Sequence, residues 1–341
     1  MGFLEVPSSE TLRIYLRWGW LSLQDPMQRA SVGRRLKRHG PVTFRMHCPG
    51  LGLFAHLNWC LWLAGWGEQQ GRLCRFECTS PNYGTPSSSL DWLPSVLEQK
   101  SKISASKNMR MTIRRWEFLP FSVGSGVPVT LAEAHCLLRR HFDVPDALVK
   151  RSKAFIDAQF GSDFVVGLHY RGTDKHIEAA RTTYEDAIAS ANRACQALHA
   201  AGVSSVAIFV ATDEERFAEH IIRSISKVRI VMMDDALRSA GCESIHSVSS
   251  NDGLRKAEEA MMDALLLGES RLLIKTASTL SGWAPILGNA MPVVLLSKPF
   301  DRCNWFPDAI LAECSVDVGC EAEAVNLALF NNKVGANRVF C

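Results

Sequence analysis

A cluster of charged residues at 169–175 is the strongest chemical signal in the sequence. The segment HYRGTDK directly follows the apolar stretch VVGL, and it places Arg171 and Lys175 on either side of Asp174. A guanidinium offers a planar fork of N–H donors, a lysine ammonium adds a mobile point charge, and Gly172 permits close approach to the backbone. This combination suits a diphosphate. The alternative is an ion pair between Arg171 and Asp174 that holds a turn in place.

Two further turns carry groups that suit an anion. The segment TASTLS (276–281) follows the apolar LLIK, so the hydroxyls of Ser278 and Thr279 would meet phosphate oxygens at a helix start. Ordinary capping of that helix by either hydroxyl is the alternative. The turn PGLG, which holds Gly50 and Gly52, follows TFRMH and precedes a helix, but the full dinucleotide-binding fingerprint is absent.

Four carboxylates are candidates for ligand or proton chemistry. Glu178 follows the charged cluster and would accept a proton from a hydroxyl, unless it is only a helix-start acid favoured by the dipole. Asp213 and Glu214 follow the apolar AIFV and either bind a ligand or cap the next helix, with capping favoured for at least one. Asp263 lies in the apolar AMMDALLLG, where an unpaired carboxylate is costly, so it needs a protein donor or the N–H edge of a base.

The histidines and cysteines do not predict a metal site. His169 stands at the end of an apolar stretch, where it is either a structural or an active residue, and His47, His56 and His246 have no ligand-like spacing. The 11 cysteines form no paired C-x-x-C units, and no Asp-x-Asp motif suggests a metal-chelated nucleotide. We therefore expect no metal and no bound cofactor.

The elements that must position these residues alternate regularly after residue 161. The expected strands are uniformly apolar, and helices separate most of them, which is typical of a parallel sheet covered on both faces. We expect strands at 163–170, 205–212, 228–233, 271–276 and 292–297, and helices at 182–202, 215–226 and 254–268. Ligands of such sheets bind beyond the carboxyl ends of the strands, where the candidate residues stand.

The first part of the chain predicts a second α/β unit. Its expected elements are strands at 43–47 and 72–78, helices at 53–70, 131–142 and 144–160, and loops at 80–92 and 99–115, the latter basic. With a boundary near Gly161, the fold class is α/β with two Rossmann-like domains, 1–160 and 161–341.

Composition limits the classes of protein further. Hydrophobic residues make up 47% of the 341 residues and charged residues 21%, so the chain can bury a core. The formal net charge of +3 argues against a protein that coats polyanions, and the basic loop lacks interleaved stacking aromatics, so no nucleic-acid partner is expected. The N-terminus lacks a secretory leader, and the apolar stretch at 51–67 is too short to span a membrane. We expect a cytoplasmic protein with reduced thiols.

The order of these motifs resembles the fucosyltransferase group. A Gly-x-Gly turn, HYRGTDK, Glu-Ala-Ala, ATDEE, an aspartate within a helix and TAS follow one another over roughly residues 42–285. The group includes core α1,6-fucosyltransferases and rhizobial nodulation fucosyltransferases, with protein O-fucosyltransferases as distant relatives. The resemblance implies a GT-B-like fold, with two Rossmann-like domains facing a central cleft. It also implies inverting, metal-independent transfer of fucose from GDP-fucose to a glycan or glycoconjugate hydroxyl.

The resemblance also implies roles for the charged cluster. Arg171 would bind the β-phosphate and offset charge on the departing GDP, and His169 would lie beside the nucleotide. Asp174 and Lys175 would shape the donor pocket. Glu178 would be the general base.

Further donor contacts are implied elsewhere in the chain. Asp263 would read the guanine edge, Asp213 would join the donor-binding residues, and Ser278 and Thr279 would contact the diphosphate. The glycine turn at 50–52 and the NYG loop would face the cleft from the other domain.

Two departures from the group's pattern leave part of the assignment open. The core-fucosylating enzymes carry a second arginine where this chain has Gly172, and the interval from Lys175 to Glu178 is one residue shorter than theirs. The alternatives are the same chemistry with another nucleotide sugar, or a non-catalytic nucleotide- or glycan-binding protein.

Overall fold

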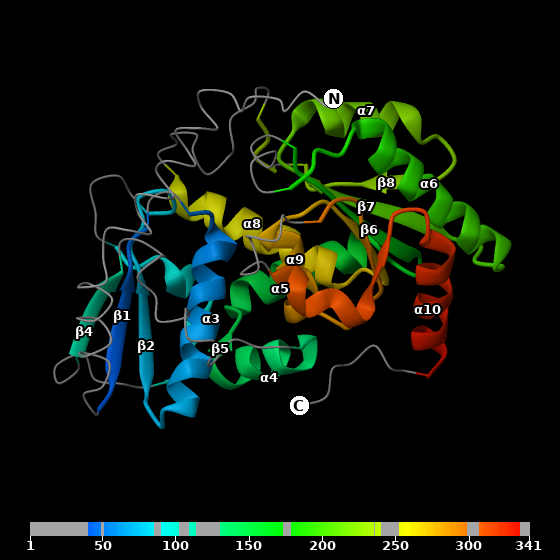
Figure 1. Ribbon diagram of the computed structural model, residues 1–341. Helices are drawn as coiled ribbons and strands as arrows, with labels where there is room; N and C mark the ends of the chain where they lie inside the picture. Colours follow the sequence, from blue (N-terminus) through cyan, green and yellow to red (C-terminus); the bar gives the residue numbers. More distant parts are fainter. Residues whose placement is uncertain are drawn as a thin grey trace, which may run out of the picture.

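Two parallel β-sheets, each accompanied by helices, make up the computed structural model of the chain (Figure 1). The structure describes residues 40–48, 51–84, 90–101, 109–113, 130–172, 179–234, 236–239, 252–298 and 307–334. The predicted α/β class is confirmed.

The first sheet has the strand order β2-β1-β4, with all pairs parallel. Its strands are β1 (Val42–Met46), β2 (Cys74–Cys78) and β4 (Met109–Ile113), and α3 (Leu53–Gln69) connects β1 to β2. The expectation of a loop throughout 99–115 is wrong for β4. There Met111 and Ile113 are buried while Arg110 and Thr112 are exposed, which is the two-residue period of an edge strand.

The second sheet has six parallel strands in the order β11-β10-β9-β6-β7-β8. Numbered along the chain from β6, this is the order 3-2-1-4-5-6 of dinucleotide-binding folds. The strands are β6 (Phe164–Tyr170), β7 (Val206–Thr212), β8 (Arg229–Val231), β9 (Leu272–Lys275), β10 (Val293–Leu295) and β11 (Ser315–Asp317). Every residue of β6, β7, β9 and β10 is buried, so the prediction of a sheet covered on both faces is confirmed.

Helices cover both faces of the second sheet. Those of this half are α6 (Tyr184–Ala200), α7 (Glu215–Ser224), α8 (Gly253–Gly268), α9 (Thr279–Leu287) and α10 (Glu321–Val334). Core residues of α6, α7 and α10 share one cluster, and those of α8 and α9 belong to the other cluster, which continues into the first sheet. Figure 1 shows α8 and α9 between the two sheets.

Direct contacts join the two halves of the chain. The helices α4 (Leu131–His141) and α5 (Asp146–Gln159) pack on α9 and α8 respectively. His135 Nδ1 donates to the carbonyl oxygen of Ile286 at 3.0 Å, and Trp283 Nε1 donates to Asn58 Oδ1 at 3.2 Å. The domain boundary between residues 160 and 161 falls between α5 and β6 and stays a prediction.

Short elements complete the described chain. They are the 3-10 helices η1 (Leu93–Ser95) and η7 (Pro307–Cys314) and the antiparallel pair of β3 (Glu98–Gln99) and β5 (Phe142–Asp143). Cys136 in α4 is disulfide-bonded, so the expectation of reduced thiols is wrong at this position. Across the described ranges, no helix is both long and apolar enough to cross a membrane.

Glu321 fastens α10 to α6 and makes stability depend on pH. Its carboxylate accepts from Arg193 Nη2 at 2.7 Å and from Ser190 Oγ at 2.6 Å. Burial alone would raise the pKa of Glu321, but these hydrogen bonds outweigh burial and lower the pKa to about 2. Because the folded pKa lies below the ordinary value of 4.5, this stabilisation is complete above pH 4.5 and disappears as pH falls towards 2.

We therefore expect the Glu321→Gln variant to lose about 1–3 kcal/mol of unfolding free energy at pH 7, because charge-assisted hydrogen bonds become neutral ones. The difference from the wild type should shrink as pH falls below 4.5. Denaturant unfolding of both proteins at pH 7, 5 and 3 measures it, and a difference that stays constant over this range would contradict the assignment.

Candidate active site

The centre of the second sheet is a topological switch point. From β6 the chain crosses through α6 to β7 on one side, and from β9 it crosses through α9 to β10 on the other. His169 of β6 stands in register with Lys275 of β9, so the carboxyl ends of the two strands meet. A crevice at this position is where open parallel sheets bind ligands, because the two crossovers diverge there.

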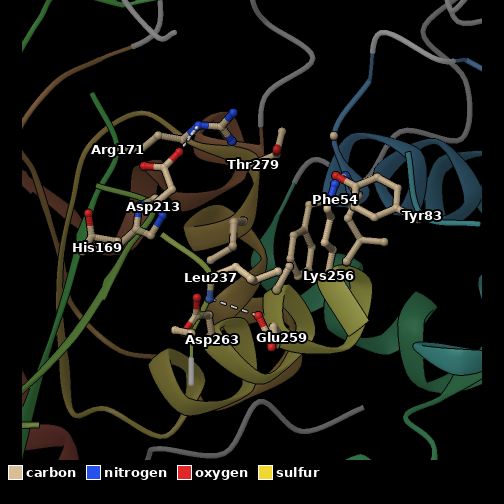
Figure 2. Close-up of a pocket in the computed structure, with 16 residues that line it drawn as sticks. Phe54, Tyr83, His169, Arg171, Asp213, Leu237, Lys256, Glu259, Asp263 and Thr279 are labelled. Carbon is tan, nitrogen blue, oxygen red and sulfur yellow. Dashed lines mark hydrogen bonds and ion pairs between the residues drawn. The ribbon is translucent and has the colours of Figure 1, made fainter. Parts of the chain in front are cut away.

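A cavity that opens to solvent lies at this position (Figure 2). The first half of the chain contributes Gly52, Leu53, Phe54 and Tyr83, and the rest comes from the ends of β6 and β7, the segment 236–237, α8 and the start of α9. The structure thus brings both halves of the chain to one site.

Six of the predicted site residues line this cavity together. They are Gly52, His169, Arg171, Asp213, Asp263 and Thr279. Ser278 is fully buried beside Thr279 and is not among the lining residues. The predictions for Gly50, Asp174, Lys175 and Glu178 lie outside the described residues, as does the suggested Arg171–Asp174 ion pair.

Arg171 is held at the mouth of the sheet by two contacts. Its backbone N–H donates to Thr276 Oγ1 at 3.0 Å, which ties the exit of β6 to the exit of β9. Its Nε lies 3.5 Å from Asp213 Oδ2, and the two side chains are 15% and 17% exposed. The acidic residue at the end of β7 therefore orients a partly buried guanidinium towards the cavity (Figure 2).

Gly172 is required by the side chains beneath it. A Cβ at this position would lie 2.5 Å from Glu214 Oε1 and 2.9 Å from the hydroxyl oxygen of Tyr170. Glu214 is fixed there because its Oε2 accepts from the hydroxyl of Tyr184 at 2.5 Å, and burial together with this bond raises the pKa of Tyr184 to about 12. The ring of Tyr170 stacks on Phe217. A larger side chain at residue 172 would have to displace this cluster.

Glu214 departs from the helix-capping role expected for one of the two acids after β7. It occupies the N-cap position of α7, but within the described residues its side chain makes no capping hydrogen bond. The carboxylate is engaged by Tyr184, and Asp213 faces the cavity. The capping expectation is wrong because tertiary partners compete successfully for both side chains.

We expect Gly172→Ala to lower the unfolding free energy by about 1–3 kcal/mol, because overpacking a filled cluster forces side chains from their preferred rotamers. The matched control is Gly52→Ala, since a Cβ at Gly52 has its nearest neighbour, the hydroxyl oxygen of Tyr83, at 3.8 Å. Urea unfolding midpoints compare the two variants. Equal midpoints for both would show that Glu214 and Tyr170 move aside freely.

One face of α8 lines the cavity with charged groups. Lys256, Glu259, Ala260 and Asp263 lie at three-, four- and seven-residue spacings and so share that face. Burial raises the pKa of Asp263 to about 7; the positive charge of Arg238 opposes this shift, while Glu259 adds to it. The neutral form of Asp263 is therefore more favoured than that of an exposed aspartate.

Glu259 orders the segment next to α8. Its Oε1 accepts from Arg255 Nε at 2.6 Å, and its Oε2 accepts from the backbone N–H of Leu237 at 3.1 Å. Leu237 lines the cavity, so Glu259 holds part of the cavity wall in place (Figure 2).

The N-terminus of α9 opens beside Arg171. Ser278 holds the N-cap position, and among the described residues its hydroxyl has no hydrogen-bond partner, so the capping alternative is wrong for this side chain. Thr279, the first helical residue, lines the cavity. A helix N-terminus carries partial positive charge and favours an anion there. Lys275, the residue that ends β9, forms a fully buried ion pair with Asp308 of η7.

The sequence analysis missed several residues of the site. Lys256 and Glu259 could have been found from their spacing to Asp263 on the same helix. Phe54 carries no such signal, because its position depends on how the two halves pack. Tyr83 belongs to the NYG loop, which was expected to face the cleft, and it lines the cavity. The hydroxyl oxygen of Tyr83 accepts a hydrogen bond from the backbone N–H of Leu53 at 2.7 Å. Tyr83 therefore lies against the first residue of α3, directly after the glycine turn.

The described part of the chain holds no cluster of three or more His, Cys, Asp or Glu side chains that could bind a metal ion.

Comparison with known proteins gives structural likenesses only. No protein-family model matches the sequence, and neither does any curated protein. The fucosyltransferase NodZ from Bradyrhizobium is 15% identical with a TM-score of 0.44, over 74% of this chain and 94% of that one. A mutant of FUT1 from Arabidopsis thaliana in complex with GDP is 12% identical with a TM-score of 0.43, over 87% and 80%. A family 9 glycosyl transferase from Veillonella parvula is 8% identical with a TM-score of 0.44, over 81% and 85%.

Proposed function

We propose that the chain is a GT-B-like glycosyltransferase that moves a sugar from a GDP-linked donor to a hydroxyl of a glycan or glycoconjugate. The proposed donor sugar is fucose. The observation that carries this proposal is the convergence of Arg171 and the N-terminus of α9 on one cavity at the switch point of the sheet. A guanidinium fork and a helix N-terminus both favour phosphate oxygens.

Asp263 supports guanine as the base. Guanine presents adjacent N–H donors on one edge, and a carboxylate accepts two such hydrogen bonds in parallel. Asp263 lies on α8 in the same cavity as Arg171, and burial raises its pKa to about 7. Two N–H donors would favour its ionised form and offset the cost of burying the charge. Uracil and adenine lack this pair of adjacent donors.

The proposed reaction is direct displacement at the anomeric carbon of the donor sugar. The acceptor oxygen forms a bond to that carbon while the bond from the carbon to the phosphate oxygen breaks, and its electron pair leaves with GDP. Negative charge grows on the diphosphate during this step, so Arg171 and the α9 terminus stabilise the transition state more than the ground state. The hydroxyl proton goes to a carboxylate, for which Glu178 remains the proposed base.

The acceptor is proposed to enter from the side of the first sheet. Gly52, Phe54 and Tyr83 line the cavity from that half of the chain. Figure 2 shows Phe54 and Tyr83 opposite Arg171. Inversion and metal independence belong to the same proposal, since a single displacement inverts the carbon and the protein's own cations meet the leaving group.

Calorimetric titration with GDP, UDP and ADP, without added metal, tests the proposal. Micromolar binding of GDP in preference to the other two is the expected result. Preference for UDP or ADP, or no binding, would overturn the GDP-sugar assignment. Binding of GDP without turnover of GDP-fucose on any glycan acceptor would instead favour a nucleotide-binding protein without catalysis.

A further inference from the structure

The turn that follows β6 brings one described cation, Arg171, to the cavity. The position next to it cannot supply another, because a Cβ at Gly172 would point at Glu214 and Tyr170. Asp213 also lies 3.5 Å from Arg171 and offsets part of its charge. A diphosphate carries more negative charge than this arrangement balances, so a second cation from elsewhere would improve the fit.

Lys256 is the other lysine or arginine among the described residues that line the cavity. It is 6% exposed and stands on α8, two helical turns before Asp263, which separates the two positions by about 10 Å along the helix axis. Asp263, the proposed guanine contact, and Lys256 therefore lie at different points along the side of the cavity that α8 forms. In Figure 2 the side chain of Lys256 extends from α8 towards Phe54 and Tyr83.

The start of α8 is held against the first half of the chain. A Cβ at Gly253 would lie 2.5 Å from the carbonyl oxygen of Gly84, so the helix and the 83–84 loop are in close backbone contact. Lys256 follows one turn later and therefore stands where the two halves meet. A ligand that extends from Asp263 along α8 reaches this point with its far end.

Burial makes an anionic ligand favourable at Lys256. The attraction between an ammonium and a phosphate is stronger in such a water-poor environment than in bulk water. Burial also lowers the pKa of Lys256, and an anion beside it would raise that pKa again.

We propose that Lys256 is the second cation of the donor site, binding the diphosphate from the α8 side while Arg171 binds it from the β6 side. The proposal rests on the proposed function, because it requires a nucleoside diphosphate or its sugar ester as the ligand. During transfer Lys256 would hold phosphate oxygens on which charge accumulates as the sugar leaves.

The test compares a diphosphate with the nucleoside that lacks it. Titration of GDP and of guanosine is carried out on the wild type, Lys256→Met, Lys256→Arg and the control Lys227→Met, whose lysine is exposed. We expect Lys256→Met to weaken GDP binding roughly 10- to 100-fold, as for one charge-assisted contact, and to leave guanosine binding unchanged. Lys256→Arg should retain most GDP affinity, and Lys227→Met should match the wild type. The dependence of GDP affinity on salt should also weaken in Lys256→Met.

The outcomes separate this proposal from the function on which it rests. Unchanged GDP affinity in Lys256→Met, or equal losses for GDP and guanosine, would overturn the role of Lys256 alone. A wild type that prefers UDP or ADP would overturn the guanine assignment, while the same comparison of that diphosphate with its nucleoside would still decide Lys256. A wild type that binds no nucleoside diphosphate would overturn both. If Lys256→Met does not fold, a loss of GDP affinity in Lys256→Gln that Lys256→Arg lacks serves as the supporting result.

Discussion

Replacing Arg171 with alanine is expected to lower kcat for sugar transfer by about 10²–10³-fold, the loss typical of a donor aimed at charge that develops in the transition state. Arg171 reaches the cavity from the carboxyl end of β6, and the contact with Asp213 orients it. The variant should still fold, because β6 is held by its paired strands and by the backbone bond to Thr276, which alanine keeps.

Initial rates with GDP-fucose and a glycan acceptor, measured beside thermal unfolding, check this result. Arg223→Ala is the matched control, since Arg223 is an exposed arginine of α7 whose i,i+4 partner is Glu219. Such a surface pair contributes about 0.3–0.5 kcal/mol at most, so the control should keep its activity. Turnover near the wild-type rate in Arg171→Ala would show that the leaving group lies elsewhere.

Four strands of the second sheet, β6, β7, β9 and β10, were predictable because they are largely apolar and fully buried. The short strand β11 was not predicted, since it is Ser-Val-Asp with Asp317 exposed. β6 and β7 are buried at every position, so their sequences are continuous apolar runs without exposed polar residues between them. The strand β4 was missed for the opposite reason. It lies at a sheet edge with two exposed side chains between buried ones, and the basic residues around it outweigh its short alternation.

Much of the site was predictable for a topological reason. Residues that follow different strands of one parallel sheet meet at one edge, so His169, Arg171, Asp213 and Thr279 could be grouped without knowing any distance. The side chains of α8 are different, because spacing shows that Lys256 shares a face with Asp263 but does not show where that face points. That orientation comes from packing between the halves of the chain.

The expected helix caps illustrate a further limit of local patterns. Glu214 and Ser278 stand at the N-cap positions of α7 and α9, as their sequences suggested. The hydroxyl of Tyr184, 30 residues away in sequence, engages Glu214 instead of the helix backbone. Local propensity therefore places the helix ends correctly while tertiary contacts decide what the side chains do.

Gly288→Ala is expected to cause the largest loss of stability, about 3 kcal/mol or more, because its methyl group would collide with backbone atoms. A Cβ at Gly288 would lie 2.6 Å from the Cα of Gly268, at the point where the ends of α8 and α9 cross. Backbone cannot rotate aside as a side chain can, so the two helices would have to separate. The backbone N–H of Asn289 also donates to the carbonyl oxygen of Gly268 at 3.2 Å, and separation would stretch this bond.

Unfolding of three glycine variants in guanidinium chloride tests this steric explanation. A Cβ at Gly268 would lie 2.8 Å from the carbonyl oxygen of Ala284, whereas a Cβ at Gly84 meets nothing nearer than 3.7 Å. The losses should therefore rank Gly288→Ala above Gly268→Ala, with Gly84→Ala close to the wild type. Because α8 carries Asp263 and Lys256 while α9 begins at Thr279, folded Gly288→Ala should also bind GDP more weakly. A Gly288→Ala midpoint equal to that of Gly84→Ala would show that the two helices are not in the close contact on which the geometry of the cavity depends.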